Sequence, residues 1–218
     1  MITPQTIKEN KQIQTYIRRA DETLAAMGYT EHSTAHVSRV AHFAEKILAS
    51  LDYPVRTCEL AWIAGYMHDI GNVINRIDHA QSGAVMAFRI LDNLGMDADE
   101  IATICSAIGN HDESTAYPVS AVAAALILAD KTDVRRNRVR TKDVAQFDIH
   151  DRVNYAVTKS ATTLTEDGAI VLDLTIDPTI SPVLDYFEIF MDRTLLCRKA
   201  ADKLGLTFRL IINGQSVL

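Results

Sequence analysis

The adjacent pair His68-Asp69 constrains this sequence more than any other feature, because histidines and aspartates recur on both sides of it. Imidazole and carboxylate groups together suit a hard-to-borderline divalent metal ion. Six such groups are more than one ion usually takes from a protein, so their number predicts a two-metal site. The candidate ligands are His36, His68, Asp69, His79, His111 and Asp130.

Apolar residues at three-to-four spacing, with helix start and stop signals, predict a mainly α-helical fold that places most of these ligands at helix ends. Two successive ligands can point into one site only where the backbone turns, and bundle interiors are a usual place for metal sites. The expected helices run from Thr3-Pro4 to Gly28, from near Thr30, from Pro54 to His68-Asp69, from Asp78 to Leu94, from Asp97 or Asp99 to Ile108, and from Pro118 to Asp130.

After Arg140 the pattern changes and predicts a small α+β segment. We therefore expect a helical metal-binding domain over residues 1–145, including the N-terminal helix, and an α+β appendage over residues 146–218. In the appendage, apolar and polar residues alternate at 153–157 and again at 170–176, which predicts two strands, and Asp167-Gly168 between them predicts a hairpin turn. A helix from Ser181-Pro182 to Gly205 and a strand at 206–212 are expected to follow.

Three segments resemble the HD superfamily of metal-dependent phosphohydrolases. They are His36-Val37-Ser38-Arg39-Val40, similar to its opening His-x-x-Arg-Val; His68-Asp69-Ile70-Gly71, its signature doublet; and Ile127-Leu128-Ala129-Asp130-Lys131, which carries its closing aspartate. In subgroups with two metals a further pair of histidines enters, and His79-Ala80-Gln81-Ser82-Gly83 and Asn110-His111-Asp112-Glu113 resemble those segments. The resemblance covers about residues 28 to 140. It implies an HD-type helical bundle whose primary site is His36, His68, Asp69 and Asp130, with Asp69 bridging two ions.

Two departures separate this chain from phosphodiesterases of the HD-GYP type. Asn72 stands where many of them have lysine, and Asn110-His111-Asp112 stands where they often have His-His-Glu. A lysine acid at position 72 is therefore unavailable, and neither a third metal nor action on cyclic di-GMP is implied. The general acid is left open between Lys131 and a metal-bound water.

These features favour a metal-dependent phosphohydrolase that uses activated water on a phosphomonoester or phosphodiester, with a nucleotide as the favoured substrate. We expect two divalent ions, iron or manganese first, with magnesium, zinc, nickel or cobalt as alternatives. Asp69 and Lys131 are the candidate catalytic residues. The candidate substrate-binding residues are Lys131, Arg135, Arg136 and His32. The planar guanidinium group of arginine can bind two phosphate oxygens at once. The alternatives are a solvated basic loop for the cluster after Asp130 and a helix-capping or supporting role for His32.

Two other functions stay open, an HD-type di-iron oxygenase and a nucleotide-sensing regulatory module. The net charge of 22 − 28 = −6 argues against general nucleic-acid binding, and a small phosphorylated substrate is the expected partner. The longest apolar run, Ala121 to Ala129, is short of the roughly 20 residues of a membrane helix, and no secretory signal is visible. We therefore expect a cytoplasmic protein without membrane contact. An odd number of cysteines predicts reduced thiols, and a homodimer is one possible assembly.

Overall fold

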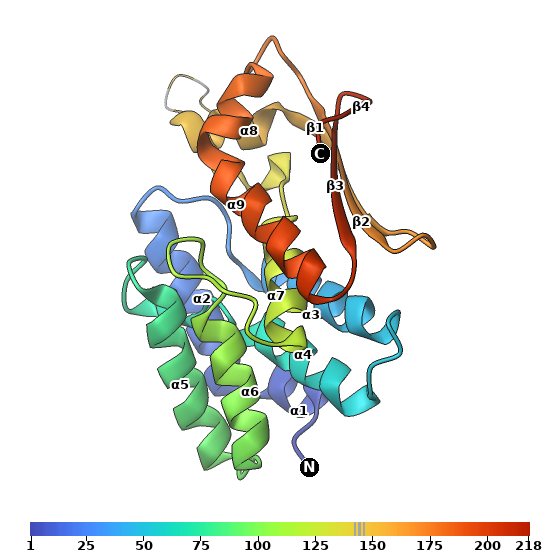
Figure 1. Cartoon of the computed structure of the whole chain (residues 1–218). Helices are drawn as coiled ribbons and strands as arrows, with labels where there is room; N and C mark the ends of the chain where they lie inside the picture. Colours follow the sequence, from blue (N-terminus) through green and yellow to red (C-terminus); the bar gives the residue numbers. More distant parts are fainter. Residues whose placement is uncertain (142, 144, 146) are drawn as a thin grey trace. The chain divides into compact units, whose positions relative to one another are not determined.

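The computed structural model describes residues 1–141, 143, 145 and 147–218, and it divides into two compact units, Met1–Asp130 and Lys131–Leu218. Helices make up the first unit, and the second combines helices with a small sheet (Figure 1). This confirms the expected fold class, a helical bundle followed by a small α+β part. The expected domain boundary at 145 and 146 includes Gln146, which lies outside the described residues, and it stays a prediction.

Helices of the first unit pack in pairs, α3 against α4 and α5 against α6, while α2 and α5 both contact the short 3₁₀ helix η1. Every residue from Leu60 to Met67 of α4 is buried, so α4 is a central helix of the unit. The elements are α1 (Pro4–Glu9), α2 (Lys11–Ala26), α3 (Thr34–Ala49), α4 (Val55–Met67), η1 (Ile70–Val73), α5 (His79–Asn93), α6 (Ala98–Gly109) and α7 (Ala121–Lys131), whose last residue falls in the second unit.

The N-terminal region differs from the single helix that the sequence predicted. The helix is interrupted at Asn10, whose backbone is extended at ψ 114° and whose side chain accepts hydrogen bonds from the N–H groups of Gln12 and Ile13. Asparagine is a strong helix N-cap, because its short amide satisfies N–H groups that have no partner within the helix. In the same way Ser33 caps α3, which therefore starts later than the predicted Thr30.

Two glycines allow close backbone contacts beside the His-Asp pair. A Cβ atom at Gly65 would lie 2.8 Å from the Cα atom of Ala41, so α4 can approach α3 only without a side chain there. A Cβ atom at Gly71 would lie 2.0 Å from the carbonyl oxygen of His79 and 2.5 Å from the amide nitrogen of Gly83. The contact between η1 and α5 therefore requires glycine at position 71.

The second unit contains a four-stranded sheet of order β1-β2-β3-β4. Strands β1 and β2 are antiparallel, β2 and β3 are parallel with α9 connecting them, and β3 and β4 are antiparallel. Helix α9 packs against β2 and β3. The elements are η2 (Arg136–Arg138), α8 (Ile149–Ala156), β1 (Val157–Leu164), β2 (Ala169–Ile176), α9 (Val183–Lys203), β3 (Thr207–Ile212) and β4 (Gln215–Ser216).

One predicted strand is wrong, because the alternating segment at 153–157 is helical through Ala156. The side chain of Asp148 accepts the N–H of Asp151 and starts α8, while Val153 and Ala156 are buried on one face of that helix. The predicted turn at Asp167-Gly168, the long helix and the strand at 206–212 are observed, with the two-residue strand β4 following.

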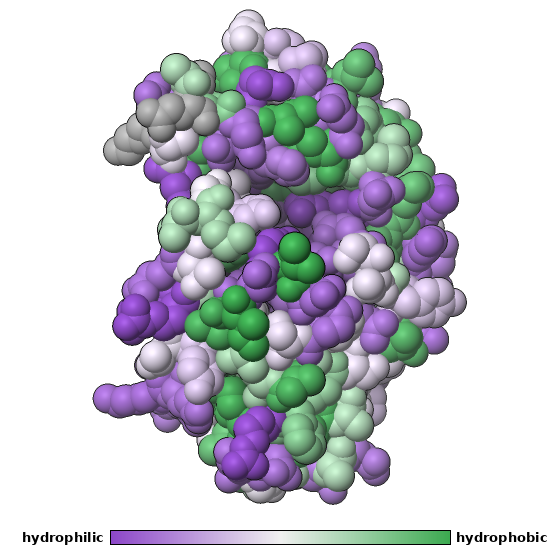
Figure 2. All heavy atoms as spheres, turned by 90° about the vertical axis from the view of Figure 1, so that its left-hand side faces the viewer, coloured by the Kyte–Doolittle hydropathy of each residue, from purple (hydrophilic) through white to green (hydrophobic). Residues whose placement is uncertain are grey.

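On the face drawn in Figure 2, small apolar patches are interspersed among polar residues. Within the described part of the chain, no helix combines the length and the apolar character needed to cross a bilayer. The three cysteines, all of them described, form no disulfide, as expected.

Candidate metal centre

Six buried imidazole and carboxylate side chains of the first unit gather where its helices begin or end. None is more than 9% exposed. His36 lies in the first turn of α3, His68 directly follows α4, Asp69 precedes η1, His79 is the first residue of α5, His111 follows α6, and Asp130 lies near the end of α7.

One group of ligand atoms consists of His36, His68 and Asp130, whose donor atoms all lie within 4.8 Å of one another. The Oδ1 atom of Asp130 is 3.4 Å from Nε2 of His36 and 3.7 Å from Nε2 of His68. The Oδ2 atom of Asp69 faces the same two imidazoles, at 3.5 Å from His36 and 3.1 Å from His68. These four residues are the set predicted for the primary site.

A second group consists of His68, Asp69 and His111, again within 4.8 Å. The ring centroid of His111 lies 4.9 Å from that of His68 and 5.1 Å from that of His79. His79 borders this group, since its Nε2 atom is 3.7 Å from Oδ1 of Asp69. The two oxygens of Asp69 thus face different imidazoles, which is the arrangement a bridging carboxylate needs.

Three of the histidines are oriented by the same local hydrogen bond. In each, Nδ1 contacts the backbone carbonyl oxygen three residues earlier, and because a carbonyl can only accept, Nδ1 carries the hydrogen. When the ring is neutral, the lone pair is then on Nε2, the atom that faces the cluster. The distances are 2.8 Å from His68 to Gly65, 3.0 Å from His79 to Arg76 and 2.6 Å from His111 to Ile108.

The buried carboxylates of the cluster stabilise positive charge beside them. Burial lowers the pKa of His68, but the carboxylates of Asp69 and Asp130 raise it to about 10. Burial raises the pKa of Asp69, but the positive charge of His68 holds that pKa well below its usual value. Among the described residues, Nε2 of His68 and Oδ2 of Asp69 are buried without a hydrogen-bond partner. Buried polar atoms of these types fit a divalent metal ion.

Asn72 supports Asp69 directly. Its Nδ2 atom donates to Oδ1 of Asp69 and to the backbone carbonyl oxygen of Asp69, both at 3.0 Å. Asn72 is fully buried, and its Oδ1 atom has no hydrogen-bond partner within the described residues. The residue that replaces the lysine of the related phosphodiesterases therefore orients a candidate ligand.

Sequence reasoning missed Arg76, which lies in the loop before α5. Its Nη1 atom donates to Nε2 of His79 at 3.2 Å, and its Nη2 atom is 3.8 Å from Oδ1 of Asp112. The same Asp112 oxygen is 3.9 Å from Nε2 of His79. The Arg76 guanidinium also lies 5.8 Å from the ring centroid of Tyr29. A lone arginine in a loop carries no sequence signal for this role beyond its position three residues before His79.

His32 was expected to bind substrate, and the structure places its ring 5.4 Å from the ring of His36. Its Nδ1 atom contacts the carbonyl oxygen of Thr30 at 2.7 Å, and its backbone N–H donates to Asp21. His32 is therefore a neighbour of the cluster, and its role in substrate binding stays a prediction.

The other expected substrate-binding residues belong to the second unit. Arg135 binds Asp133 with two hydrogen bonds of 2.6 and 2.9 Å. The guanidinium of Arg136 lies 4.5 Å from the ring centroid of Tyr155, and Lys131 is only 3% exposed. Their contacts with a substrate stay predictions.

Comparison with known proteins identifies the family. Residues 34–152, more than half of the chain, match the HD domain family, and the chain belongs to it. The matched segment contains all six candidate ligands, and HD domains bind divalent metals. The expected membership of the HD superfamily is thereby confirmed.

Two relatives illustrate how far the similarity extends. An uncharacterized protein from Methanocaldococcus jannaschii is 27% identical over 173 residues, and the match covers 69% of this chain but only 66% of that relative. A crystal structure of a predicted HD superfamily hydrolase from an uncultured Thermotogales bacterium shares 26% identity, with a TM-score of 0.46. That match covers 57% of this chain and 68% of the other.

Proposed function

We propose that this chain is a metal-dependent phosphohydrolase that cleaves a phosphomonoester or phosphodiester, with a nucleotide as the favoured substrate. The observation that carries the proposal is the buried cluster itself, in which the donor atoms of His36, His68 and Asp130, and those of His68, Asp69 and His111, lie within 4.8 Å of one another. Membership of the HD domain family supports it.

The chain's own residues would divide the work as follows. His36, His68, Asp69 and Asp130 would hold one ion, and His79 and His111 would hold a second together with Asp69. Bound divalent ions would supply water of lowered pKa as the nucleophile and positive charge for the phosphate oxygens. Asn72 keeps the Asp69 carboxylate in place, so that both of its oxygens stay directed at the cluster.

Arg76 is the group best suited to bind a phosphate at this site. Its planar guanidinium offers several parallel N–H donors, which match two phosphate oxygens at once. Asp112 lies within ion-pair distance and would orient it. Because the amide of Asn72 has no proton to give at neutral pH, proton donation to the leaving group is assigned to Lys131, the residue that follows Asp130 in the chain.

The proposal is tested by phosphate release from a panel of nucleotides, with manganese-loaded protein under nitrogen. We expect Asp69→Ala to lower turnover more than about 100-fold, because even residues that merely support metal ligands change activity by about 10- to 100-fold. Asp192→Ala, which removes an exposed carboxylate from α9, is the control. Both variants should keep wild-type helical circular dichroism.

Phosphate release without oxygen would favour hydrolysis over the di-iron oxygenase alternative. Activity that requires air and yields no phosphate would instead overturn the proposed reaction. Unchanged turnover in Asp69→Ala would remove the cluster from the mechanism.

A further inference from the structure

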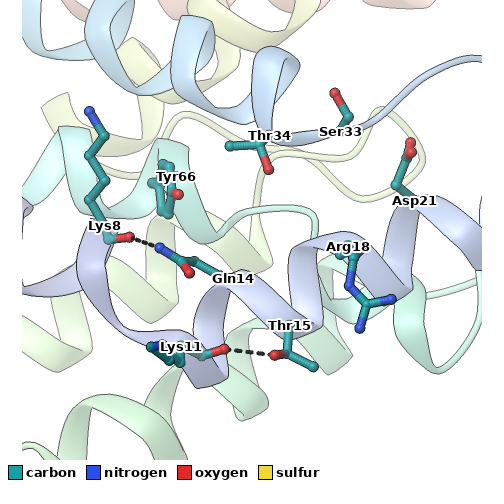
Figure 3. Close-up of a pocket in the computed structure, with 9 residues that line it drawn as sticks. All are labelled: Lys8, Lys11, Gln14, Thr15, Arg18, Asp21, Ser33, Thr34 and Tyr66. Atoms are coloured by element: carbon teal, nitrogen blue, oxygen red, sulfur yellow. Dashed lines mark hydrogen bonds between the residues drawn. The ribbon is translucent and has the colours of Figure 1, made fainter.

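The first unit contains a pocket of about 550 Å³ that is lined by polar residues and by none of the candidate metal ligands. It is bordered by α1, α2, the start of α3 and the end of α4 (Figure 3). Pockets of this size commonly hold small-molecule ligands. Its occupant can be inferred from the groups that face it.

The charge of the lining is positive. Lys8, Lys11 and Arg18 contribute three cations, and Asp21 contributes one carboxylate. Arg18 is paired with Glu22 at 2.5 Å, whereas the ammonium groups of Lys8 and Lys11 form no ion pair with any described residue. Lys8 and Lys11 lie on one side of the view in Figure 3, with Arg18 and Asp21 on the other. A ligand with one anionic end fits this distribution.

Tyr66 adds a neutral hydrogen-bond donor to the lining of the pocket. The residue is only 2% exposed and lines the pocket, yet its hydroxyl makes no hydrogen bond with any described residue. Burial raises the pKa of this hydroxyl, which therefore stays protonated and able to donate. The hydroxyl can therefore donate a hydrogen bond to an acceptor in the pocket.

The start of α3 adds further positive potential. Ser33 and Thr34, the N-cap and first residue of this 16-residue helix, line the pocket. Backbone N–H groups and the helix dipole make the N-terminal end of a helix favourable for anions. The carboxylate of Glu31 already accepts hydrogen bonds from the N–H and hydroxyl groups of Ser33 and offsets part of this potential, so the two lysines carry most of the positive charge of the pocket.

The pocket is separate from the metal cluster although both use the same helices. Thr34 precedes His36 by two residues, and Tyr66 precedes His68 by two residues. Residues two apart in a helix are rotated by about 200° and so point to nearly opposite sides. The metal cluster and the pocket therefore occupy opposite faces of α3 and α4.

We propose that this pocket binds a small phosphorylated molecule, with its phosphate among Lys8, Lys11 and the hydroxyl of Tyr66 and its hydroxyl-bearing end toward Asp21. This site does not depend on the proposed hydrolytic reaction, because none of its residues serves the metal cluster. A sugar phosphate has the required combination of one anionic end and several hydroxyl groups.

The test is isothermal titration of the full chain, kept metal-free with a chelator, with ribose 5-phosphate, inorganic phosphate and citrate. We expect saturable binding of ribose 5-phosphate that is tighter than that of the other two. Lys8→Gln with Lys11→Gln should weaken it at least about tenfold, because two charge-assisted hydrogen bonds are lost. Tyr66→Phe, which keeps the buried ring, should weaken it by about two- to tenfold.

The matched control is Lys199→Gln with Lys203→Gln on α9, which changes the charge equally and should bind like wild type. Equal weakening in the control and the pocket variant would mean a general charge effect and would overturn the site. So would citrate binding as tight as that of ribose 5-phosphate, unaltered binding in the lysine and Tyr66 variants, or no saturation below about 10 mM. Circular dichroism of each variant verifies that the fold is retained.

Discussion

Replacing Gly71 by alanine tests how the backbone around the His-Asp pair positions the metal cluster. The new Cβ atom would lie 2.0 Å from the carbonyl oxygen of His79, 2.5 Å from the amide nitrogen of Gly83 and 2.7 Å from Oγ of Ser82. The first two are backbone atoms, which cannot rotate away as a flexible side chain can. The start of α5 must therefore move away from η1.

The size of the effect follows from these distances. Going from 2.0 Å to an ordinary contact of 3.4 Å requires a shift of about 1.4 Å at the carbonyl of His79. Overpacking of this kind costs roughly 1–3 kcal/mol, and the backbone nature of the clash favours the upper end of that range. Metal–ligand distances tolerate only about 0.2 Å, so His79 would be displaced from a ligand position.

Two measurements on purified protein check this reasoning. Urea denaturation should show a loss of about 2–3 kcal/mol in the free energy of unfolding. Atomic emission analysis after manganese loading should show about one ion per chain in place of about two. Gly109→Ala is the matched control, because its Cβ atom would meet only Cβ of Ala84, at 3.6 Å. That change ends in an ordinary contact and should leave metal content unaltered.

The result that would refute the argument is a Gly71→Ala protein within about 0.5 kcal/mol of wild type, since that is the range of a neutral substitution. A large loss of stability with metal content unchanged would be equally informative. It would mean that the imidazole ring of His79 keeps its position when the backbone carbonyl group of His79 moves.

Three further predictions address the ligands, the phosphate and the fold. His79→Ala combined with His111→Ala should lower bound manganese from about two ions per chain to about one, and an unchanged ratio would contradict a dinuclear centre. Arg76→Met should raise the KM of a phosphate ester about tenfold or more while metal content stays the same; an unaltered KM would exclude phosphate binding by Arg76. Arg56 donates hydrogen bonds of 2.6 and 2.5 Å to Glu100. These bonds hold the pKa of the Glu100 carboxyl below the usual 4.5. That stabilisation is present above pH 4.5 and is lost as the pH falls through the lowered pKa. Arg56→Met should therefore cost about 1 kcal/mol at pH 7, and urea denaturation should show a smaller difference from wild type near pH 3.

The identity of the candidate ligands could be predicted from the sequence because it depends on residue type and spacing. Helix start and stop signals were enough to place His68-Asp69 at the end of one helix and Asp130 near the end of another. No information about long-range contacts was needed. Even the orientation of the histidines has a local cause. The carbonyl groups of Gly65 and Ile108 lie in the last turns of α4 and α6, where backbone acceptors lack partners within the helix.

Other features depended on contacts that no local pattern encodes. Arg76 meets His79 only because the loop before α5 turns back, with Asp78 in a left-handed conformation at φ 55°. The segment at 153–157 satisfies both a two-residue and a helical period, so the N-cap at Asp148 decided its structure rather than the alternation. Asn10 likewise interrupts the N-terminal helix by capping α2, although the start signal at Thr3-Pro4 and the stop signal at Gly28 predicted one continuous helix.

The residues that follow the His-Asp pair provide no ligand, yet they determine what the pair can do. Gly71 lets the first residue of α5 approach Asp69, and Asn72 donates to the same carboxylate oxygen that His79 faces. A lysine at position 72 would instead bring an ammonium group to that carboxylate, where it would compete with a cation for the same oxygen. An uncharged amide orients Asp69 without such competition. In the proposed two-metal centre, Asn72 would therefore favour retention of the second ion, and proton donation would come from another part of the site.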